Sequence, residues 1–431
     1  MRFVALLLLV ASCGDGRWVP DASIPSDDNR GLVSLTIRSD QPIASTDIVY
    51  FQNADFSLVL ATRPRPDGVA NAFMAPGGYV TYVGANASSR LIYTFSAVQP
   101  GDELVLDTRF DGAFGPPLSF RMLAELDPAG FFYELRTTCG SFDLGINPSP
   151  TETFALDQNL VLPSCAGEKA DMLLLGRSEQ QRPNRFQFVR DITDAVRFAA
   201  DDYSVPTPIT VEVNGLPAPA SVPRVGLARQ VVLNGTALFD QLVTVFPQTD
   251  TAAATFDVPE IPEATSITRV EITRTLDVIG TQNIVEWSQY SAPISLDYRQ
   301  LELREYTSLP IFEVTRDTLS WTESTKGELA DAVFAGIEFF RPEAQTWWTL
   351  IAPRSAESSV RFPALPDTTL NPNGDDFVTV YLLANLSVTG GYDAVRPTLL
   401  GDWGLGQPMP TFGPSGRMVY QTVNPSLVPE F

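Results

Sequence analysis

The amino-acid sequence predicts an all-β protein built from tandem sandwiches. Short runs rich in Val, Ile, Thr, Phe and Tyr recur along the chain and are broken by Pro, Gly, Asn and Asp, which is typical of strands and turns. Long stretches with helical periodicity are nearly absent. The chain of 431 residues is long enough for several domains, and a hydrophobic content of 44% can supply a sizeable core.

The amino terminus has the pattern of an export signal, MRFVALLLLVASC. Arg2 precedes an apolar run over residues 3–11, which is shorter than the roughly 20 residues that a helix needs to span a bilayer. Small residues follow the run, as they do at signal peptidase sites. The stretch Val10-Ala11-Ser12-Cys13 resembles the lipobox of bacterial lipoproteins.

The lipobox resemblance implies cleavage after residue 12, giving a signal peptide over 1–12 and a mature chain that starts at a lipidated Cys13. Diacylglycerol and palmitate-type chains on this cysteine would anchor the protein in the membrane, because two or three acyl chains hold a protein stably. Gly14 rather than aspartate follows, which implies the outer membrane of the cell envelope. Residues 13–30 are rich in Asp, Gly, Pro and Ser and predict a flexible tether.

Residues 31–107 predict the first sandwich. In the run LVSLTIR, Val33, Leu35 and Ile37 alternate with polar or small residues, as in a half-buried strand. Six further strands are expected, at 47–51, 57–62, 71–74, 79–83, 90–95 and 103–106. About seven strands in this length match an immunoglobulin-like or transthyretin-like sandwich.

A second resemblance covers about 75 residues of this range. Arg65-Pro66-Asp67-Gly68 between two strands, followed by residues 75–81 (APGGYVT), is similar to carboxypeptidase regulatory-like modules. The resemblance implies an accessory structural domain that contributes no catalytic residues.

Residues 108–204 predict a second sandwich, with strands at 117–125, 131–138, 152–162 and 171–177. Cys139 and Cys165 remain after export to an oxidising compartment, where a disulfide between them is expected. Residues 191–203 carry Ile192, Ala195, Val196 and Ala199 at helical spacing, so this stretch predicts a short amphipathic helix.

Two more sandwiches are expected, over 205–300 and 301–431. The first of these should contain strands at 209–213, 230–233, 242–246, 253–258, 268–274, 284–287 and 294–296. The second should contain strands at 311–314, 318–321, 332–340, 347–351, 359–362 and 377–383. In 332–340 the alternation of Val333, Ala335, Ile337 and Phe339 favours a strand with outward-facing neighbours over a helix. The ranges 108–204 and 301–431 share a weakly similar order of runs, which suggests diverged sandwich repeats.

Composition excludes several classes of function. The net charge of −22 argues against a nucleic-acid partner, which needs a basic face. The sequence contains no histidine, which excludes Ser-His-Asp hydrolases, Cys-His proteases and His-ligated metal sites. No cofactor is expected, and the protein is predicted not to be an enzyme.

Three features could still carry chemistry or binding. A glycosidase needs two carboxyl groups on facing walls of a cleft. The candidate acidic pairs are Glu323 with Glu328, Asp201 with Asp202, and Asp375 with Asp376. Surface charge is the simpler interpretation of these residues. The loop 371–376 (NPNGDD) has the oxygen-rich look of a calcium loop but also of a plain turn. Of Trp347 and Trp348, one should be buried and the other exposed, because neighbouring strand residues face opposite ways. An exposed ring could stack on a ligand, but a tryptophan half-covered by a neighbouring loop or domain is the simpler interpretation.

These features favour a non-catalytic, lipid-anchored envelope protein that acts as a structural, display or binding module. Its expected partners are the membrane, through the anchor, and a protein or glycan. The alternative is a glycan-binding or carbohydrate-processing lipoprotein that uses exposed tryptophans and acidic residues.

Overall fold

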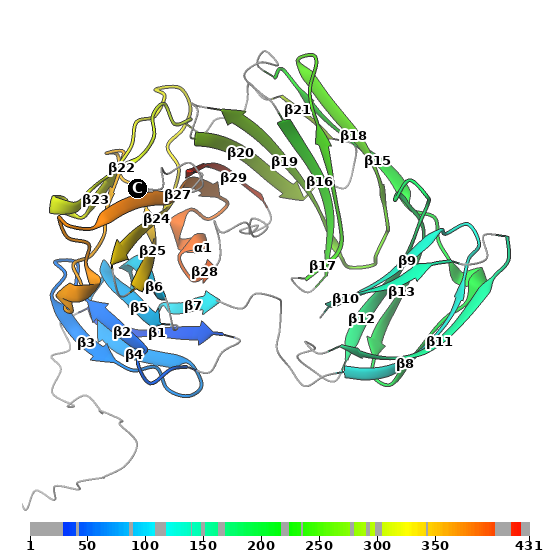
Figure 1. Ribbon diagram of the computed structural model, residues 1–431, viewed down its shortest axis with the longest axis horizontal. Coiled ribbons are helices and arrows are strands. Elements are labelled where there is room, and N and C mark those ends of the chain that lie inside the picture. Colours follow the sequence, from blue (N-terminus) through cyan, green and yellow to red (C-terminus); the bar gives the residue numbers. More distant parts are fainter. Residues whose placement is uncertain are drawn as a thin grey trace, which may run out of the picture.

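In the computed structural model, the described residues are 29–39, 43–85, 89–107, 118–138, 140–147, 151–162, 169–216, 224–233, 236–275, 280–289, 294–297, 304–341, 344–400 and 415–423. Within these ranges strands predominate, with 64% strand and 4% helix (Figure 1). The predicted all-β fold of tandem sandwiches is therefore confirmed.

Three consecutive runs of seven strands form the first three parts of the chain, which we call units 1 to 3. Unit 1 contains β1 Gly31–Arg38, β2 Ile48–Gln52, β3 Leu58–Thr62, β4 Val69–Met74, β5 Gly78–Ala85, β6 Ser89–Val98 and β7 Glu103–Asp107. Unit 2 contains β8 Leu118–Leu126, β9 Phe132–Thr137, β10 Gly140–Ile146, β11 Phe154–Leu162, β12 Ala170–Arg177, β13 Pro183–Ile192 and β14 Ala195–Phe198. Unit 3 contains β15 Thr207–Asn214, β16 Arg224–Leu233, β17 Thr236–Val245, β18 Thr251–Val258, β19 Thr265–Thr275, β20 Gly280–Gln289 and β21 Ile294–Asp297.

The same connectivity occurs in all three units. Counted within a unit, strands 3-2-5-6 lie side by side in one sheet, and strands 4-1-7 form the facing sheet. In each small sheet the first strand is antiparallel to the fourth and parallel to the seventh. Units 1 to 3 thus share one strand order, whereas the sequence suggested a repeat only between 108–204 and 301–431.

The remaining chain forms unit 4, a modified version of this plan. It contains β22 Ile311–Glu313, β23 Thr318–Ser320, β24 Ala332–Arg341, β25 Ala344–Pro353, β26 Ser359–Arg361, β27 Phe377–Val388, β28 Thr398–Leu400 and β29 Ser415–Val423, with a short helix α1 Tyr392–Val395. Strands β25-β24-β27-β29 correspond to 3-2-5-6, and β26-β23 correspond to 4-1. β22 takes the edge next to β23, and β28 leaves unit 4 to pair in parallel with β7 of unit 1.

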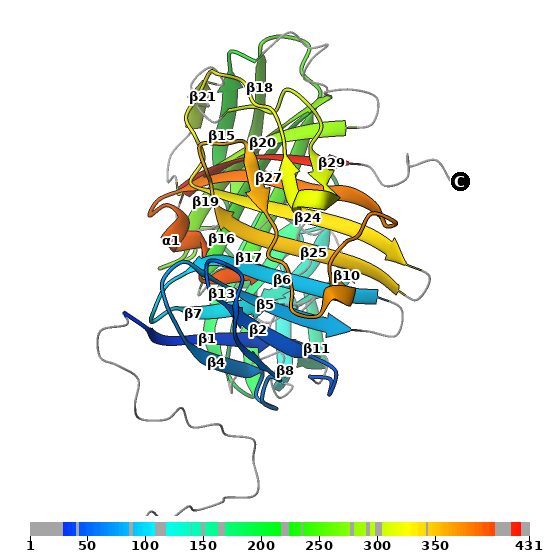
Figure 2. The ribbon, with the colours of Figure 1, turned by 90° about the vertical axis from the view of Figure 1, so that its left-hand side faces the viewer.

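One twelve-stranded sheet joins three of the units. Its order is β17-β16-β19-β20-β29-β27-β24-β25-β6-β5-β2-β3, so the predicted ranges 205–300, 301–431 and 31–107 each supply four strands. β20 pairs with β29 antiparallel, and β25 pairs with β6 in parallel. Figures 1 and 2 show this sheet as a curved wall with smaller sheets packed on it. The sheet order in space is therefore unit 3, unit 4, unit 1.

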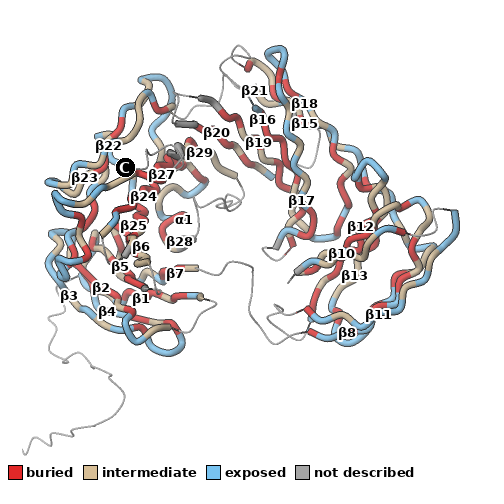
Figure 3. The backbone as a smooth tube through the Cα atoms, viewed as in Figure 1, coloured by how far each residue is buried: buried red, intermediate tan, exposed pale blue. Residues whose placement is uncertain are grey.

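Buried residues run along the strands of this wall (Figure 3), and on the central strands they divide between two core clusters, one on each face. In β24 the row Val333, Ala335, Ile337 and Phe339 faces one core, while Ala332 and Phe334 belong to the other. The expected outward-facing neighbours on this strand are thus buried as well. A sheet buried on both faces needs apolar residues at successive positions, and the sequence of β24, AVFAGIEFFR, provides them.

The predicted helix over 191–203 is wrong. β13 continues to Ile192, β14 spans Ala195–Phe198, and a 3₁₀ turn covers Ala200–Asp202. Val196 and Phe198 are both buried and lie two residues apart, so a strand period governs this stretch. The helical spacing of its apolar residues was coincidental.

Most other predicted strands lie where the sequence places them. Strands β10, β13, β14, β28 and β29 were not predicted. Cys13, Cys139 and Cys165 lie outside the described residues, as do the signal peptide and most of the tether. The lipidation and disulfide hypotheses therefore remain predictions. Among the residues that the structure does describe, no helix is long and apolar enough to cross a membrane.

Candidate functional site

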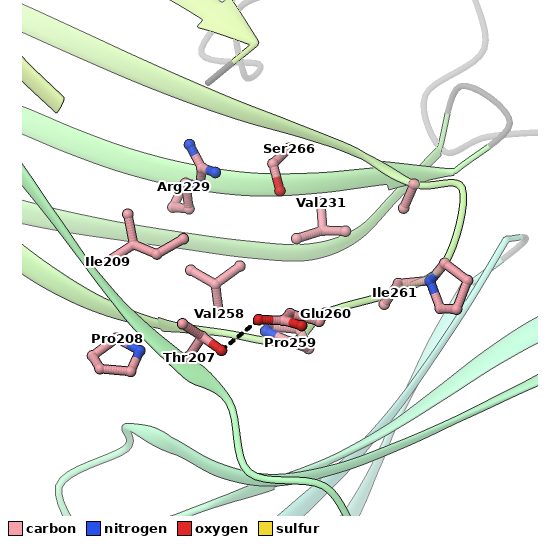
Figure 4. Close-up of a pocket in the computed structure, with 12 residues that line it drawn as sticks. Thr207, Pro208, Ile209, Arg229, Val231, Val258, Pro259, Glu260, Ile261 and Ser266 are labelled. Carbon is pink, nitrogen blue, oxygen red and sulfur yellow. Dashed lines mark hydrogen bonds between the residues drawn. The ribbon is translucent and has the colours of Figure 1, made fainter. Parts of the chain in front are cut away.

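A cavity of about 540 Å³ lies inside unit 3. It opens between the two sheets of this sandwich, at the end where β18 leads into β19. β15 and β18 contribute Ile209 and Val258 to its walls, and β16 contributes Arg229 and Val231 (Figure 4). Volume and lining place the cavity in the class of small-molecule pockets, which are mostly apolar with a few polar groups.

Arg229 is the unusual residue of this pocket. It sits on β16 in the row Val225, Leu227, Arg229, Val231, Leu233, whose apolar members belong to the core between the two sheets. The side chain has 0% exposure, and its Nη1 donates a hydrogen bond to the Thr268 hydroxyl on β19. Burial lowers the pKa of the Arg229 guanidinium from its ordinary value. A guanidinium thus occupies a core position.

Comparison with the other units shows that the fold does not require this charge. The corresponding second strands carry buried apolar residues toward their small sheets. These are Val49 and Phe51 in unit 1, Tyr133 and Leu135 in unit 2, and Val333, Ala335, Ile337 and Phe339 in unit 4. Arg229 and the adjacent cavity replace part of the core packing that the other units have at this level.

Polar side chains also stand at the edge of the cavity. The Thr207 hydroxyl donates a 2.6 Å hydrogen bond to Glu260 Oε1, as Figure 4 shows. Glu260 is exposed, whereas Ser266 on β19 lies across the cavity from it. The pocket therefore has an acidic, solvent-facing end and a cationic, buried end.

A second, more open hollow of about 400 Å³ lies where β20, β27 and β29 meet. Its lining includes the hydroxyl residues Ser288, Ser387, Thr389 and Ser415, together with Glu286 and Arg417. Arg417 Nε lies 3.3 Å from Glu286 Oε2. Burial raises the pKa of Glu286, and the neighbouring Arg417 works against that shift. We call this hollow the polar groove.

The acidic pairs proposed from the sequence have unlike surroundings. Glu323 is buried and bound to Arg354, whereas Glu328 is exposed. Asp201 and Asp202 are both exposed on the 3₁₀ turn that follows β14. Asp375 is exposed, while Asp376 binds Arg341. The favoured interpretation of these acids was surface charge, and Glu323 and Asp376 instead have structural partners.

The loop at 371–376 is organised around a guanidinium. Arg341 donates hydrogen bonds to the carbonyls of Thr369 and Asn371 and to the Asp376 carboxylate. The Asp376 Oδ2 also accepts from the Asn373 amide at 2.8 Å. Oxygens that a calcium ion would need are thus committed to Arg341. No group of three or more His, Cys, Asp or Glu side chains able to hold a metal is found among the described residues.

Trp347 and Trp348 face opposite sides of the sheet, as neighbouring strand residues must, but neither ring is exposed. Trp348 is 1% exposed, and its Nε1 donates to Thr94 Oγ1 at 2.9 Å. Trp347 is half-buried and meets the Tyr381 ring edge-on at 5.0 Å. The simpler interpretation from the sequence, a half-covered tryptophan, agrees with the half-buried Trp347, and neither ring is exposed to stack on a ligand.

Sequence reasoning missed Arg229 because it began the strand at Gln230. The signal was present in the sequence, since Val225, Leu227, Val231 and Leu233 alternate and Arg229 interrupts their row. A charge on the apolar side of an alternating strand is a sign of either a buried ion pair or a site.

No protein family model matches the chain, and no curated protein matches it. Among solved structures, a DUF3823 family protein from Bacteroides ovatus ATCC 8483 matches at 9% identity and a TM-score of 0.14, over 38% of this chain and 98% of that one. The Bacillus anthracis TIE protein matches at 9% identity and a TM-score of 0.15, over 62% of this chain and 50% of that one. Likenesses this weak carry no functional argument, so function must be argued from the residues.

Proposed function

We propose that this chain is a non-catalytic, lipid-anchored protein of the cell envelope, held at the outer membrane by Cys13, whose tandem sandwiches form a stiff scaffold that displays binding surfaces. The observation that carries the proposal is the twelve-stranded sheet that runs through three units. A scaffold must keep its parts in fixed relation, and continuous backbone hydrogen bonding across unit boundaries does this.

The junction between units 1 and 4 supports the scaffold role. β25 and β6 pair in parallel over Gln345–Ile351 and Ser89–Phe95, although about 250 residues separate them along the chain. Arg396 adds a second tie, because its Nη2 lies 2.9 Å from Asp102 Oδ1 and its side chain is only 9% exposed. Together with β28 on β7, these contacts join the first and last parts of the body.

Membrane fractionation of cells that express the full chain tests the anchor. Cys13→Ala should move the protein from the membrane fraction to the soluble fraction and abolish incorporation of an alkyne-labelled palmitate. Ser12→Ala is the matched control, since a small residue remains before the cysteine, and it should stay membrane-bound and labelled. A Cys13→Ala chain that still fractionates with membranes would contradict the lipoprotein assignment.

Glycan binding is the second candidate function, and the polar groove supports it. Its hydroxyl residues and the Glu286–Arg417 pair offer the mixed donors and acceptors that a sugar needs. On a glycan array, specific retention that Ser415→Val together with Thr389→Val removes would favour this function. Hydrolysis of any glycan that Glu286→Gln abolishes would overturn the non-catalytic assignment.

A further inference from the structure

We propose that the cavity of unit 3 binds a small amphiphile with a hydrocarbon body and a hydrogen-bond-donating head, an alcohol or an amine, and that it discriminates against anions. This inference goes beyond the scaffold role and does not depend on the lipid anchor. It rests on the apolar walls of the cavity, on the acceptor at its mouth and on the charge of the chain.

The walls of the cavity determine the body of the ligand. Ile209 and Val258 come from one sheet of the sandwich and Val231 from the other, and both valines are at most 2% exposed. The volume of about 540 Å³ is in the range of small-molecule sites. Apolar walls of this kind favour a hydrocarbon body, because removing its surface from water is favourable.

The mouth of the cavity determines the head of the ligand. Three residues that line the cavity, Pro208, Pro259 and Pro262, carry no backbone N–H and therefore offer no amide donor. The exposed Glu260 carboxylate is a hydrogen-bond acceptor, and the Thr207 hydroxyl donates to its Oε1 at 2.6 Å (Figure 4). A head that donates a hydrogen bond complements this mouth, whereas a carboxylate would meet an acceptor of the same charge.

Arg229 at the buried end orients the ligand without binding it. Its guanidinium is engaged within the protein, and one of these interactions is the hydrogen bond from Nη1 to the Thr268 hydroxyl. Its donors therefore serve the protein rather than a ligand, and its positive charge disfavours an ammonium at this end. The head of the ligand consequently lies at the mouth, near Glu260, and the hydrocarbon body lies inside.

Charge at long range favours the same kind of head. The chain has a net charge of −22, so its field repels anions and attracts cations. Near the mouth, Arg190 of unit 2 binds the Glu263 carboxylate and the Pro262 carbonyl, so this cation is already paired. Binding of an alcohol should therefore be independent of salt, whereas an amine should bind more tightly at low salt.

The test is isothermal titration calorimetry on residues 13–431, the mature chain that the lipobox implies, carrying Cys13→Ser so that no acyl chain competes. Octanol, octylamine and octanoate are the probes, since they share one hydrocarbon body and differ only in the head. The protein should bind octanol and octylamine, and it should bind octanoate at least about tenfold more weakly than either.

Two alanine substitutions test whether binding takes place in the cavity. Ala264→Phe adds bulk to a half-buried part of the lining and should weaken octanol and octylamine at least about tenfold. Ala253→Phe is the matched control, since Ala253 is exposed on the side of β18 opposite Val258. It should leave the binding of all three probes unchanged.

Glu260→Gln tests the position of the head. It should weaken octylamine about three- to fivefold, because an exposed ion pair contributes only modestly. Octanol should stay within about twofold of its original affinity, because the glutamine carbonyl still accepts a hydrogen bond. Unchanged octylamine affinity in Glu260→Gln would show that the head does not lie at the mouth.

The proposal is overturned if the protein binds neither octanol nor octylamine, or if octanoate binds as tightly as they do. It is also overturned if Ala264→Phe binds octanol and octylamine as well as the unsubstituted chain. Equal losses in Ala264→Phe and Ala253→Phe would contradict it too, because the effect would then not arise in the cavity.

Discussion

Units 3 and 4 are neighbours in one sheet, and each contains a buried arginine in different surroundings. In unit 4, Arg354 is 1% exposed and lies 2.9 Å from Glu323 Oε2, whose own side chain is 3% exposed. Its guanidinium also stacks over the Trp321 ring at 5.0 Å. In unit 3, Arg229 donates to the neutral hydroxyl of Thr268 and borders a cavity.

The two sites show how a buried charged side chain can differ in its surroundings. The Glu323 carboxylate accepts hydrogen bonds from Trp321 Nε1 and Asn385 Nδ2, both at 2.6 Å, in addition to the contact with Arg354. Such a carboxylate has its bonding capacity filled inside the protein. Arg229 instead adjoins space large enough for a small molecule. Both arginine side chains are buried, and Arg229 in addition lines a cavity.

The largest expected effect is on the Glu323–Arg354 pair. Arg354→Met should lower the free energy of unfolding by about 3–5 kcal/mol, because it leaves the Glu323 carboxylate buried without its cation. Urea unfolding followed by tryptophan fluorescence measures this loss. Arg316→Met is the control, since the Arg316–Glu313 pair is exposed, and it should change stability by less than about 1 kcal/mol. Equal effects in the two variants would show that the buried pair is not a structural element of unit 4.

The junction between units 3 and 4 gives the next effect. A Cβ at Gly416 on β29 would lie 2.3 Å from the ring of Trp287, which is 1% exposed on β20. Gly416→Ala should therefore lower the free energy of unfolding by about 2–3 kcal/mol through overpacking. Gly374→Ala, where nothing lies within 4 Å of the new Cβ, is the matched control. A stable Gly416→Ala protein would mean that β20 and β29 are not packed as the shared sheet requires.

Structural features that depend on residues close together in the sequence could be predicted, whereas those that depend on contacts between distant segments could not. The alternation of Val33, Leu35 and Ile37 predicts β1 correctly, because a strand's buried row is a local pattern. The pairing of β25 with β6 has no local signal, since it depends on where two distant units come to lie. The sequence could place one of Trp347 and Trp348 in the core, but not say what covers the other, because that depends on the same long-range arrangement.

The candidate site was only partly within reach of sequence reasoning. Arg229 stands out once the strand is extended back to Arg224, since it breaks an apolar row. The cavity beside it depends on how far the two sheets stand apart, and no single residue sets that distance. The oxygens of the loop 371–376 were recognised, but their cation is Arg341, which lies 30 or more residues away in sequence.

The Arg341–Asp376 pair tests a structural charge at the edge of unit 4. The guanidinium holds the pKa of Asp376 below its ordinary value, mainly through side-chain hydrogen bonds. A carboxyl whose pKa is lowered on folding stabilises the protein above its unfolded pKa of about 3.9 and loses this effect as pH falls through the folded value. Asp376→Asn should cost about 1–2 kcal/mol at neutral pH, with the difference shrinking below about pH 4. A pH-independent difference between wild type and variant in urea unfolding would contradict this account.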